Sequence, residues 1–337
     1  HHLSSDGDPF ASHPKLRRYA DLKAAPEGAL GACSGVFVAE GPEALRHLLA
    51  SGHVRIESLL LKKTVYERMQ AAIERRRESD SQAFDVFVAP SQRKFTEAVG
   101  YNARGALACG SVPVGRDMTW LRSKLRRKDN SNKHAWRLLA IDGCNNPANL
   151  GNLIRSAAAL QVDAVLLSDD CCDAWYRRSI RVSMGCCFRL PIVRCNLVRE
   201  LTTLHEEDDV ETFAAVISES TAPLARMAKY ARNSSGKEKW CCVVGSEAAG
   251  ISPGVQAVCR RHVRIPMAEG IDSLSITTAT SIILARLRDA ATEKGGVVIG
   301  DGQSSTITLT FSWHAATAVF LAGALCGVGL SRMNSKS

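Results

Sequence analysis

Three short segments of the chain combine glycines with a few polar or charged side chains, and each follows a predicted strand. The first segment is Asn146–Arg155. Asn149 is expected to cap a helix, and Gly151 and Arg155 share one helix face because they are four residues apart. Gly151 leaves room for a ligand or a second backbone beside the guanidinium. Three asparagines, a proline and a glycine before one arginine therefore favour a binding site over a plain capped helix.

The second segment, Gly245–Gly250, places Ser246 and Glu247 between two glycines at the end of an apolar run. Glycines permit sharp turns and let a ligand approach the backbone closely. The alternative is an ordinary turn in which Glu247 lies near a helix N-terminus, where its negative charge is favoured. By itself this segment does not decide between the two.

The third segment, residues 265–277, starts where a strand ends at Pro266 and runs through a turn into a stretch rich in serine and threonine. An apolar helix is predicted directly afterwards. Ser273 could cap that helix. It could equally belong to a polar site shared with the other two segments.

Predicted strands and helices alternate from residue 137 to residue 290, which favours a doubly wound sheet with its ligands at the carboxyl ends of the strands. The expected strands are 137–141, 164–167, 213–217, 240–244 and 262–266. The expected helices are 150–160, 174–185, 197–205, 253–260 and 274–290.

Residues 31–115 predict a separate small α/β unit with a mixed or parallel sheet. Its strands are expected at 36–38, 56–61, 84–88 and 105–109, with helices at 42–49 and 65–77. Residues 1–30 are polar, with a small basic cluster at Lys15, Arg17 and Arg18, and are predicted to be a flexible arm.

The chain has 337 residues with a formal net charge of +9, which suits a polyanionic partner but does not require one. None of the 12 cysteines forms a C-x-x-C pair, so no zinc site is expected and a reducing intracellular compartment is indicated.

The first residues lack the apolar core of a signal peptide. We therefore expect the cytoplasm or a mitochondrion; because the sequence starts without methionine, a removed transit peptide stays open.

Residues 293–337 form a C-terminal extension of unknown role. No formal charge occurs from Gln303 to Ser331, and residues 315–330 are a continuous apolar run. That run is shorter than the roughly 20 residues that a spanning helix needs. A packed or disordered extension is favoured, and a membrane contact is the alternative.

In their order and spacing, the three segments together resemble the SpoU/TrmH branch of the knotted SPOUT methyltransferases. The family pattern N-P-x-N-x-G-x-x-x-R matches residues 146–155, and G-N/S-E-x-x-G matches residues 245–250. The third pattern, I-P-M followed by S-L-N, matches in part. Ser275 stands where the family usually has asparagine, and it offers one hydrogen-bond donor where an amide offers two.

Two further stretches support the resemblance. Residues 183–191 are similar to the small-residue turn that the family places before an R-L-P strand. Residues 38–45 are similar to the start of a substrate-binding domain, itself similar to a small ribosomal protein, that many members carry.

The resemblance implies a fold, a cofactor and partners. It implies an α/β trefoil-knot methyltransferase domain at residues 137–292, preceded by an RNA substrate-binding domain at residues 31–115. Knots are almost absent from other proteins, so this expectation is sharp. It also implies S-adenosylmethionine as cofactor, RNA as substrate and a homodimer whose sites are completed by the second subunit.

The resemblance also implies site residues. Arg155 matches the catalytic arginine; since a guanidinium is a poor general base, Arg155 acts as a base only if perturbed, and otherwise orients the hydroxyl and its phosphate. The other catalytic positions are Asn149, Glu247 and Ser273, and those expected to hold the cofactor are Gly245, Ser246, Gly250, Ile265, Met267, Leu274 and Ser275.

Residues 116–136 are polar, without a clear apolar period, and are predicted to be a linker. The segment is either a solvated connection or a tether that contacts RNA phosphates between the two domains, and its flanks favour the tether. Its candidate RNA-binding residues are Arg122, Lys124, Arg126, Arg127 and Lys128.

We expect transfer of a methyl group to a ribose 2′-hydroxyl in structured RNA, with ribosomal RNA favoured over transfer RNA. The alternative is an RNA-binding scaffold or ribosome-assembly factor with weak or lost catalysis, which Ser275 motivates. A nicotinamide-dependent dehydrogenase is disfavoured because no G-x-G-x-x-G follows an early strand.

Overall fold

The computed structural model describes most of the first 292 residues of the chain. The described residues are 13–19, 22, 34–79, 83–101, 103–129, 136–218, 221–232, 236–271 and 273–292. The chain divides into the compact unit His1–Lys294 and a second unit, Gly295–Ser337. The predictions for the tail at 293–337 therefore lie outside the described residues. In the part of the chain that is described, no helix has the length and apolarity needed to cross a membrane.

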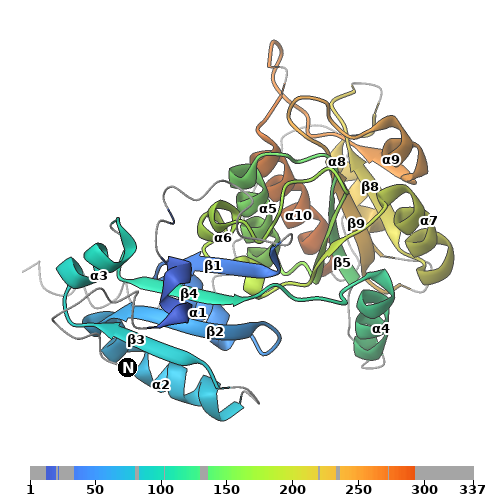
Figure 1. Cartoon of the computed structure of the whole chain (residues 1–337). Coiled ribbons are helices and arrows are strands. Elements are labelled where there is room, and N and C mark those ends of the chain that lie inside the picture. Colours follow the sequence, from blue (N-terminus) through green and yellow to red (C-terminus); the bar gives the residue numbers. More distant parts are fainter. Residues whose placement is uncertain are drawn as a thin grey trace, which may run out of the picture. The chain divides into compact units, whose positions relative to one another are not determined.

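The first sheet has four strands in the order β1-β4-β2-β3 (Figure 1). Strand β4 runs antiparallel to both β1 and β2, and β3 runs parallel to β2, so the sheet is mixed, as the sequence indicated. The strands are β1 (Val36–Glu40), β2 (Arg55–Lys62), β3 (Asp85–Ala89) and β4 (Ala106–Ser111).

Three helices accompany this sheet: α1 (Pro42–Ala50), α2 (Lys63–Ser79) and α3 (Gln92–Val99). Helix α3 was not predicted, although its ends carry ordinary signals. The Ser91 side chain accepts a hydrogen bond from the Lys94 amide, and Gly100 ends the helix in the left-handed conformation.

The second sheet has six parallel strands in the order β10-β8-β9-β5-β6-β7. Strand β5 lies between β9 and β6, so successive crossovers leave it toward opposite edges. Such a switch point is where doubly wound sheets bind ligands. The strands are β5 (Trp136–Ile141), β6 (Ala164–Leu167), β7 (Ile192–Arg194), β8 (Glu211–Ala215), β9 (Lys239–Val244) and β10 (Arg261–Val263).

Helices cover both faces of the second sheet (Figure 1). Apolar side chains of α5 and α10 pack on one face, and those of α4, α7 and α9 pack on the other. The helices are α4 (Met118–Asp129), α5 (Pro147–Ala159), α6 (Arg177–Val182), α7 (Leu197–Asp208), α8 (Leu224–Met227), α9 (Pro253–Val258) and α10 (Ile276–Thr292), with the short 3₁₀ turns η1 (Pro14–Tyr19), η3 (Cys186–Phe188) and η4 (Ala228–Ala231).

Several elements differ in extent from the prediction. The strands expected at 213–217 and 262–266 are β8 (Glu211–Ala215) and β10 (Arg261–Val263). The helix expected at 174–185 is interrupted into α6 and η3, because Met184 and Gly185 adopt positive φ angles between them. The strand expected at 189–191 begins three residues later, as β7.

The prediction of a flexible N-terminal arm is wrong for residues 13–19. Leu16 and Tyr19 are buried against the first sheet. Lys15 pairs with Asp85 at 2.6 Å, and Arg18 pairs with Glu57 at 2.6 Å. Two of the three basic residues assigned to the arm therefore hold it on the sheet.

The prediction of a linker at 116–136 is also wrong for most of its length. Residues 118–129 form helix α4, and Trp136 already belongs to β5. Met118, Leu121 and Leu125 of α4 are buried in the core of the second sheet. Helix α4 is thus an integral part of that domain.

The two sheets share an apolar contact. The Phe37 ring of β1 lies 5.7 Å from the Trp175 ring and 5.1 Å from the Phe188 ring, both from the segment between β6 and β7. A Cβ atom added to Gly185 would lie 2.6 Å from the Ala44 Cα of α1. Because only glycine permits this approach, Gly185 brings η3 against α1.

Candidate functional site

The site is built where β5 and β9 end side by side. Ile141 is paired with Val244 in register, so the segments that follow these two strands start next to each other. The Asp142 amide donates to the Val244 carbonyl at 2.9 Å, and its carboxylate accepts from the Ser252 amide at 2.7 Å. Asp142 is 5% exposed and was not singled out from the sequence, although an acid directly after the apolar run Leu138–Ile141 is an available signal.

The first segment begins with a cap that differs from the predicted one. Asn146, not Asn149, is the N-cap of α5, and its side chain accepts from the amides of Ala148 at 2.9 Å and Asn149 at 3.4 Å. Pro147 takes the first helical position, where its missing N–H costs nothing. The Asn149 side chain is therefore free of the capping role and donates to the Glu247 carboxylate at 2.9 Å.

Gly151 and Arg155 share a face of α5, as predicted. A Cβ on Gly151 would lie 2.8 Å from the Ser179 carbonyl oxygen and 2.8 Å from the Val182 Cβ. The space beside Gly151 is therefore occupied by the backbone of α6. Arg155 is exposed, and it is not among the described residues that line the cavity below.

The second segment is a tight turn that depends on Gly245. A Cβ on Gly245 would lie 1.9 Å from the Gly250 carbonyl carbon and 2.1 Å from the Ile251 nitrogen. Two backbone hydrogen bonds, of 3.0 and 2.9 Å, join Ser246 and Gly250 across the turn. Gly250 has a φ of 69°, and Ser246 Oγ accepts from the Ala249 amide at 3.1 Å. The turn thus presents Glu247 toward Asn149.

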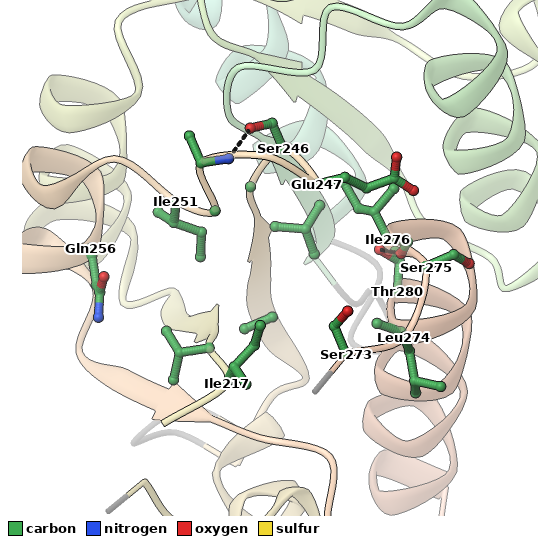
Figure 2. A pocket seen from close by; sticks show the side chains of 17 residues that line it. Ile217, Ser246, Glu247, Ile251, Gln256, Ser273, Leu274, Ser275, Ile276 and Thr280 are labelled. Carbon is green, nitrogen blue, oxygen red and sulfur yellow. Dashed lines mark hydrogen bonds between the residues drawn. The ribbon is translucent and has the colours of Figure 1, made fainter. Parts of the chain in front are cut away.

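A cavity of about 490 Å³ lies at the carboxyl ends of β8 and β9 (Figure 2). Its volume falls in the range of roughly 300–1,000 Å³ that small-molecule sites occupy. Figure 2 shows side chains from the second segment, from the start of α10 and from the end of β8 around one space. Of the predicted residues, the lining includes Gly245, Ser246, Glu247, Gly250, Ser273, Leu274 and Ser275.

Ile265 and Met267 line a smaller adjoining hollow of about 90 Å³. Ser273 and Leu274 line both spaces, so the third segment forms their common wall. Ser275 has a further role, because its hydroxyl accepts from the Thr278 amide at 3.3 Å and caps α10. The capping residue is therefore Ser275 and not Ser273.

Some cavity residues were missed by sequence reasoning. Ala215 is the last residue of β8, Ile217 follows that strand, and Gln256 comes from α9. The strand ending at Ile217 was expected, but nothing local marks the end of β8 as part of a site. Thr280 lines the cavity from α10 and has its hydroxyl bonded to the Ile276 carbonyl at 2.7 Å.

The predicted basic linker residues are placed differently from the expectation. Arg122 is 15% exposed and lies 3.2 Å from the Asp208 carboxylate of α7, and Arg126 donates to the same carboxylate at 2.6 Å. Arg127 donates to Ser123 of its own helix, and Lys124 lies over the Trp120 ring at 5.1 Å. The Lys128 side chain lies outside the described part of the chain. Arg122 and Arg126 therefore act in holding α4 on α7.

The cysteines give no sign of a metal centre within the described residues. No group of three or more potential ligands is found there, and the ten described cysteines are free thiols. Burial raises the pKa of Cys187, Cys242 and Cys259 to about 12, so these thiols behave as small apolar side chains.

Comparison with known proteins gives a consistent family. Residues 137–285 match the family described as SpoU rRNA Methylase. An uncharacterized tRNA/rRNA methyltransferase of Mycobacterium bovis is 34% identical over 143 residues, which cover 42% of this chain and 48% of the relative. The 23S rRNA (guanosine(2553)-2′-O)-methyltransferase RlmP of Bacillus subtilis is 29% identical over 154 residues, covering 46% and 58%. The chain thus spans about half the length of these relatives.

The fold has a solved counterpart. The AdoMet-bound rRNA methyltransferase of Sinorhizobium meliloti superposes with a TM-score of 0.61 at 19% sequence identity, covering 86% of this chain and 97% of that one. This likeness confirms the predicted fold class, an α/β chain with a parallel sheet. The three predicted segments all fall inside the matched family region. Residues 137–285 of the chain therefore belong to the SpoU rRNA methylase family.

Proposed function

We propose that the chain transfers a methyl group from S-adenosylmethionine to a ribose 2′-hydroxyl of RNA, with ribosomal RNA favoured over transfer RNA. The observation that carries the proposal is the cavity at the ends of β8 and β9, whose wall contains residues of both the second and the third segment. The RlmP relative, which is named as a 23S rRNA 2′-O-methyltransferase, supports the same reaction.

The residues around the cavity fit S-adenosylmethionine. The wall combines polar side chains with the apolar Val244, Ile251 and Leu274, and the apolar part suits an adenine ring and a methylene chain. Gly245 and Gly250 carry no side chains, so they line the cavity with backbone atoms alone. Gly245, Ser246, Gly250, Ile265, Met267, Leu274 and Ser275 would hold the cofactor. Bound there, S-adenosylmethionine supplies a methyl group already activated on a sulfonium.

The chain's own contribution is alignment of the reacting groups. Asn149 fixes the Glu247 carboxylate at the cavity edge, and Ser273 adds a hydroxyl in the wall. Arg155 lies six residues beyond Asn149 on α5, about 9 Å along the helix axis. We assign Arg155 to orienting the RNA hydroxyl and its phosphate, a task that suits the planar fork of a guanidinium.

The position of Arg155 supports a homodimer. As described, its side chain is exposed and does not line the cavity of its own chain. A second copy placed against α5 would bring Arg155 to the neighbouring cavity, in keeping with the subunit-completed sites implied by the family resemblance. Because bacterial and mitochondrial relatives are known, we propose the cytoplasm or a mitochondrion as its compartment.

The test is methylation of total RNA by the full chain with radiolabelled S-adenosylmethionine, followed by mapping of 2′-O-methyl sites. We expect label in ribose, lost in Arg155→Ala and retained in the matched surface variant Arg75→Ala of α2. Label in the base, or equal label with Arg155→Ala, would contradict the proposal.

The second candidate, an RNA-binding scaffold, is favoured by Ser275 alone. Ser275 is engaged in capping α10 and in bonds of 3.2 and 2.9 Å with the hydroxyls of Thr277 and Thr278. Calorimetry separates the two functions. Micromolar binding of S-adenosylmethionine argues for the enzyme, whereas RNA binding without cofactor binding argues for the scaffold.

A further inference from the structure

A cationic surface that the sequence did not indicate lies where α1, α5 and η3 meet. Cys186 of η3 is half-buried, and this burial raises the pKa of its thiol. The charges that oppose the rise come from Arg189, Arg155 and Arg46, in that order, and no carboxylate is among them. Three guanidinium groups from distant parts of the sequence therefore lie within electrostatic range of one sulfur atom.

Two glycines bring these elements together. The close contact at Gly151 places α5 against α6, and Arg155 follows one turn later on the same face of α5. The contact of Gly185 with Ala44 places η3 against α1, and Arg46 lies two residues beyond Ala44. These backbone contacts thus fix the packing of the elements that carry Arg155 and Arg46.

Helix α6 extends the same surface. Arg178 and Arg181 lie one helical turn apart and are exposed, whereas Ile180 between them is buried. Arg177 donates to the Tyr101 hydroxyl at 3.0 Å, and the charge of Arg181 also acts on that hydroxyl. The exposed side chains of α6 therefore include two further cations.

These arginines have few protein partners. Within the described residues, Arg155, Arg178, Arg181 and Arg189 make no side-chain hydrogen bond or ion pair. Arg46 pairs with Glu43 at 2.9 Å in an exposed position of α1, where such pairs contribute little, and its guanidinium lies 3.4 Å from His47 Nε2. Guanidinium groups with few neutralising acids repel one another, and a polyanion relieves that repulsion.

We propose that Arg46, Arg155, Arg178, Arg181 and Arg189 form an arginine track that binds the phosphodiester backbone of the RNA. This inference rests on the proposed function, because Arg155 is its catalytic end. The track runs from α1 of the first sheet, past η3 and α6, to Arg155 on α5. Guanidinium groups bind phosphate oxygens by paired hydrogen bonds, and such contacts position a strand without reading its sequence.

The test compares two double variants of the full chain. Arg178→Gln/Arg181→Gln removes two track charges, and Arg68→Gln/Arg75→Gln removes two exposed charges from α2. Binding of a fluorescein-labelled RNA hairpin is measured by anisotropy from about 50 to about 200 mM KCl. If each phosphate contact contributes roughly 0.7–0.9 to the slope of log K against log salt, the track variant loses about 1.4–1.8 of that slope.

At about 0.15 M salt, the loss of these two contacts should raise the Kd of the track variant for RNA about 10- to 30-fold. The α2 variant should stay within about twofold of the parent, and both variants should bind S-adenosylmethionine with the parent Kd. Equal slopes for the two variants, or an unchanged slope for the track variant, would overturn the track. Failure of the unmodified chain to bind the hairpin would also overturn the track.

The two proposals fail in different ways. An unmodified chain that binds RNA through the track but methylates nothing supports the track and contradicts the proposed function. An unmodified chain that methylates RNA, with a track variant of unchanged KM for RNA and unchanged salt slope, supports the function and overturns the track.

Discussion

Replacing Gly245 with alanine tests whether the turn after β9 forms the cofactor site. The added Cβ would lie 1.9 Å from the Gly250 carbonyl carbon and 2.1 Å from the Ile251 nitrogen. Both obstacles are backbone atoms, so no side chain can rotate away. Restoring an ordinary contact requires the turn to open by more than about 1 Å, which breaks the two hydrogen bonds between Ser246 and Gly250. At about 0.5–1.5 kcal/mol for each bond, the cost is about 1–3 kcal/mol.

The matched control is Gly254→Ala in the first turn of α9. A Cβ there meets only a Val198 methyl group at 3.5 Å, an ordinary contact, and alanine favours the helix. Calorimetry with S-adenosylmethionine and thermal unfolding are measured on both variants. We expect Gly245→Ala to lower Tm by about 3–10 °C and to weaken cofactor binding at least tenfold, while Gly254→Ala changes neither. Parent-like cofactor affinity in Gly245→Ala would refute the assignment of this turn to the site.

Three further predictions concern charge and hydrogen bonding. Asp208→Asn removes the buried carboxylate that lies closest to Arg122 and that also accepts from Arg126, and it should cost about 2–4 kcal/mol in urea unfolding. Glu207→Gln, whose side chain is 59% exposed, should cost less than about 1 kcal/mol. Similar losses would show that the pairing of Asp208 with α4 is unimportant. Burial and three neighbouring cations lower the pKa of His53 to about 4. The stability that neutral His53 contributes is therefore complete above about pH 6.5 and is lost as the pH falls toward 4. Over this interval the parent should lose about 1–2 kcal/mol more unfolding free energy than His53→Gln, and parallel pH profiles of the two would contradict this. A double-mutant cycle of Asn149→Ala and Glu247→Ala should give a coupling energy of about 0.5–1.5 kcal/mol in unfolding, and strict additivity would show that the bond between the first two segments contributes nothing.

The parallel strands could be predicted from the sequence because both of their faces are buried. Residues 164–167 and 240–244 are continuous apolar runs, as expected when helices cover a sheet on both sides. The segments after these strands could be predicted as a site because parallel strands end at one edge. The bond from Asn149 to Glu247 could not, since it joins residues 98 positions apart.

The capping residue of α5 was predicted wrongly although a local signal was present. Pro147 suits the first helical position, which makes the preceding Asn146 the cap. Placing the cap at Asn149 gave that side chain a structural task that it does not have. With the cap at Asn146, the Asn149 side chain is available to donate to Glu247 in the candidate site.

Helix α4 was missed because its charges hid a short apolar period. Met118, Leu121 and Leu125 follow the spacing of a helix face, but two cations lie between Leu121 and Leu125 and three more follow Leu125 directly. Whether such cations are free or paired depends on a partner far away in sequence. Asp208, which binds two of them, lies on α7 some 80 residues later.

In this chain, a high density of cations along the sequence therefore does not mean that those cations are unpaired at the surface. The stretch with the highest local density, residues 122–128, directs Arg122 and Arg126 to carboxylates of α7. The five arginines of the proposed track are spread from residue 46 to residue 189, and only the glycine contacts that join α1, α5 and η3 gather them. A polyanion responds to uncompensated charge at a surface, so the dispersed set is the better candidate to position RNA at Arg155.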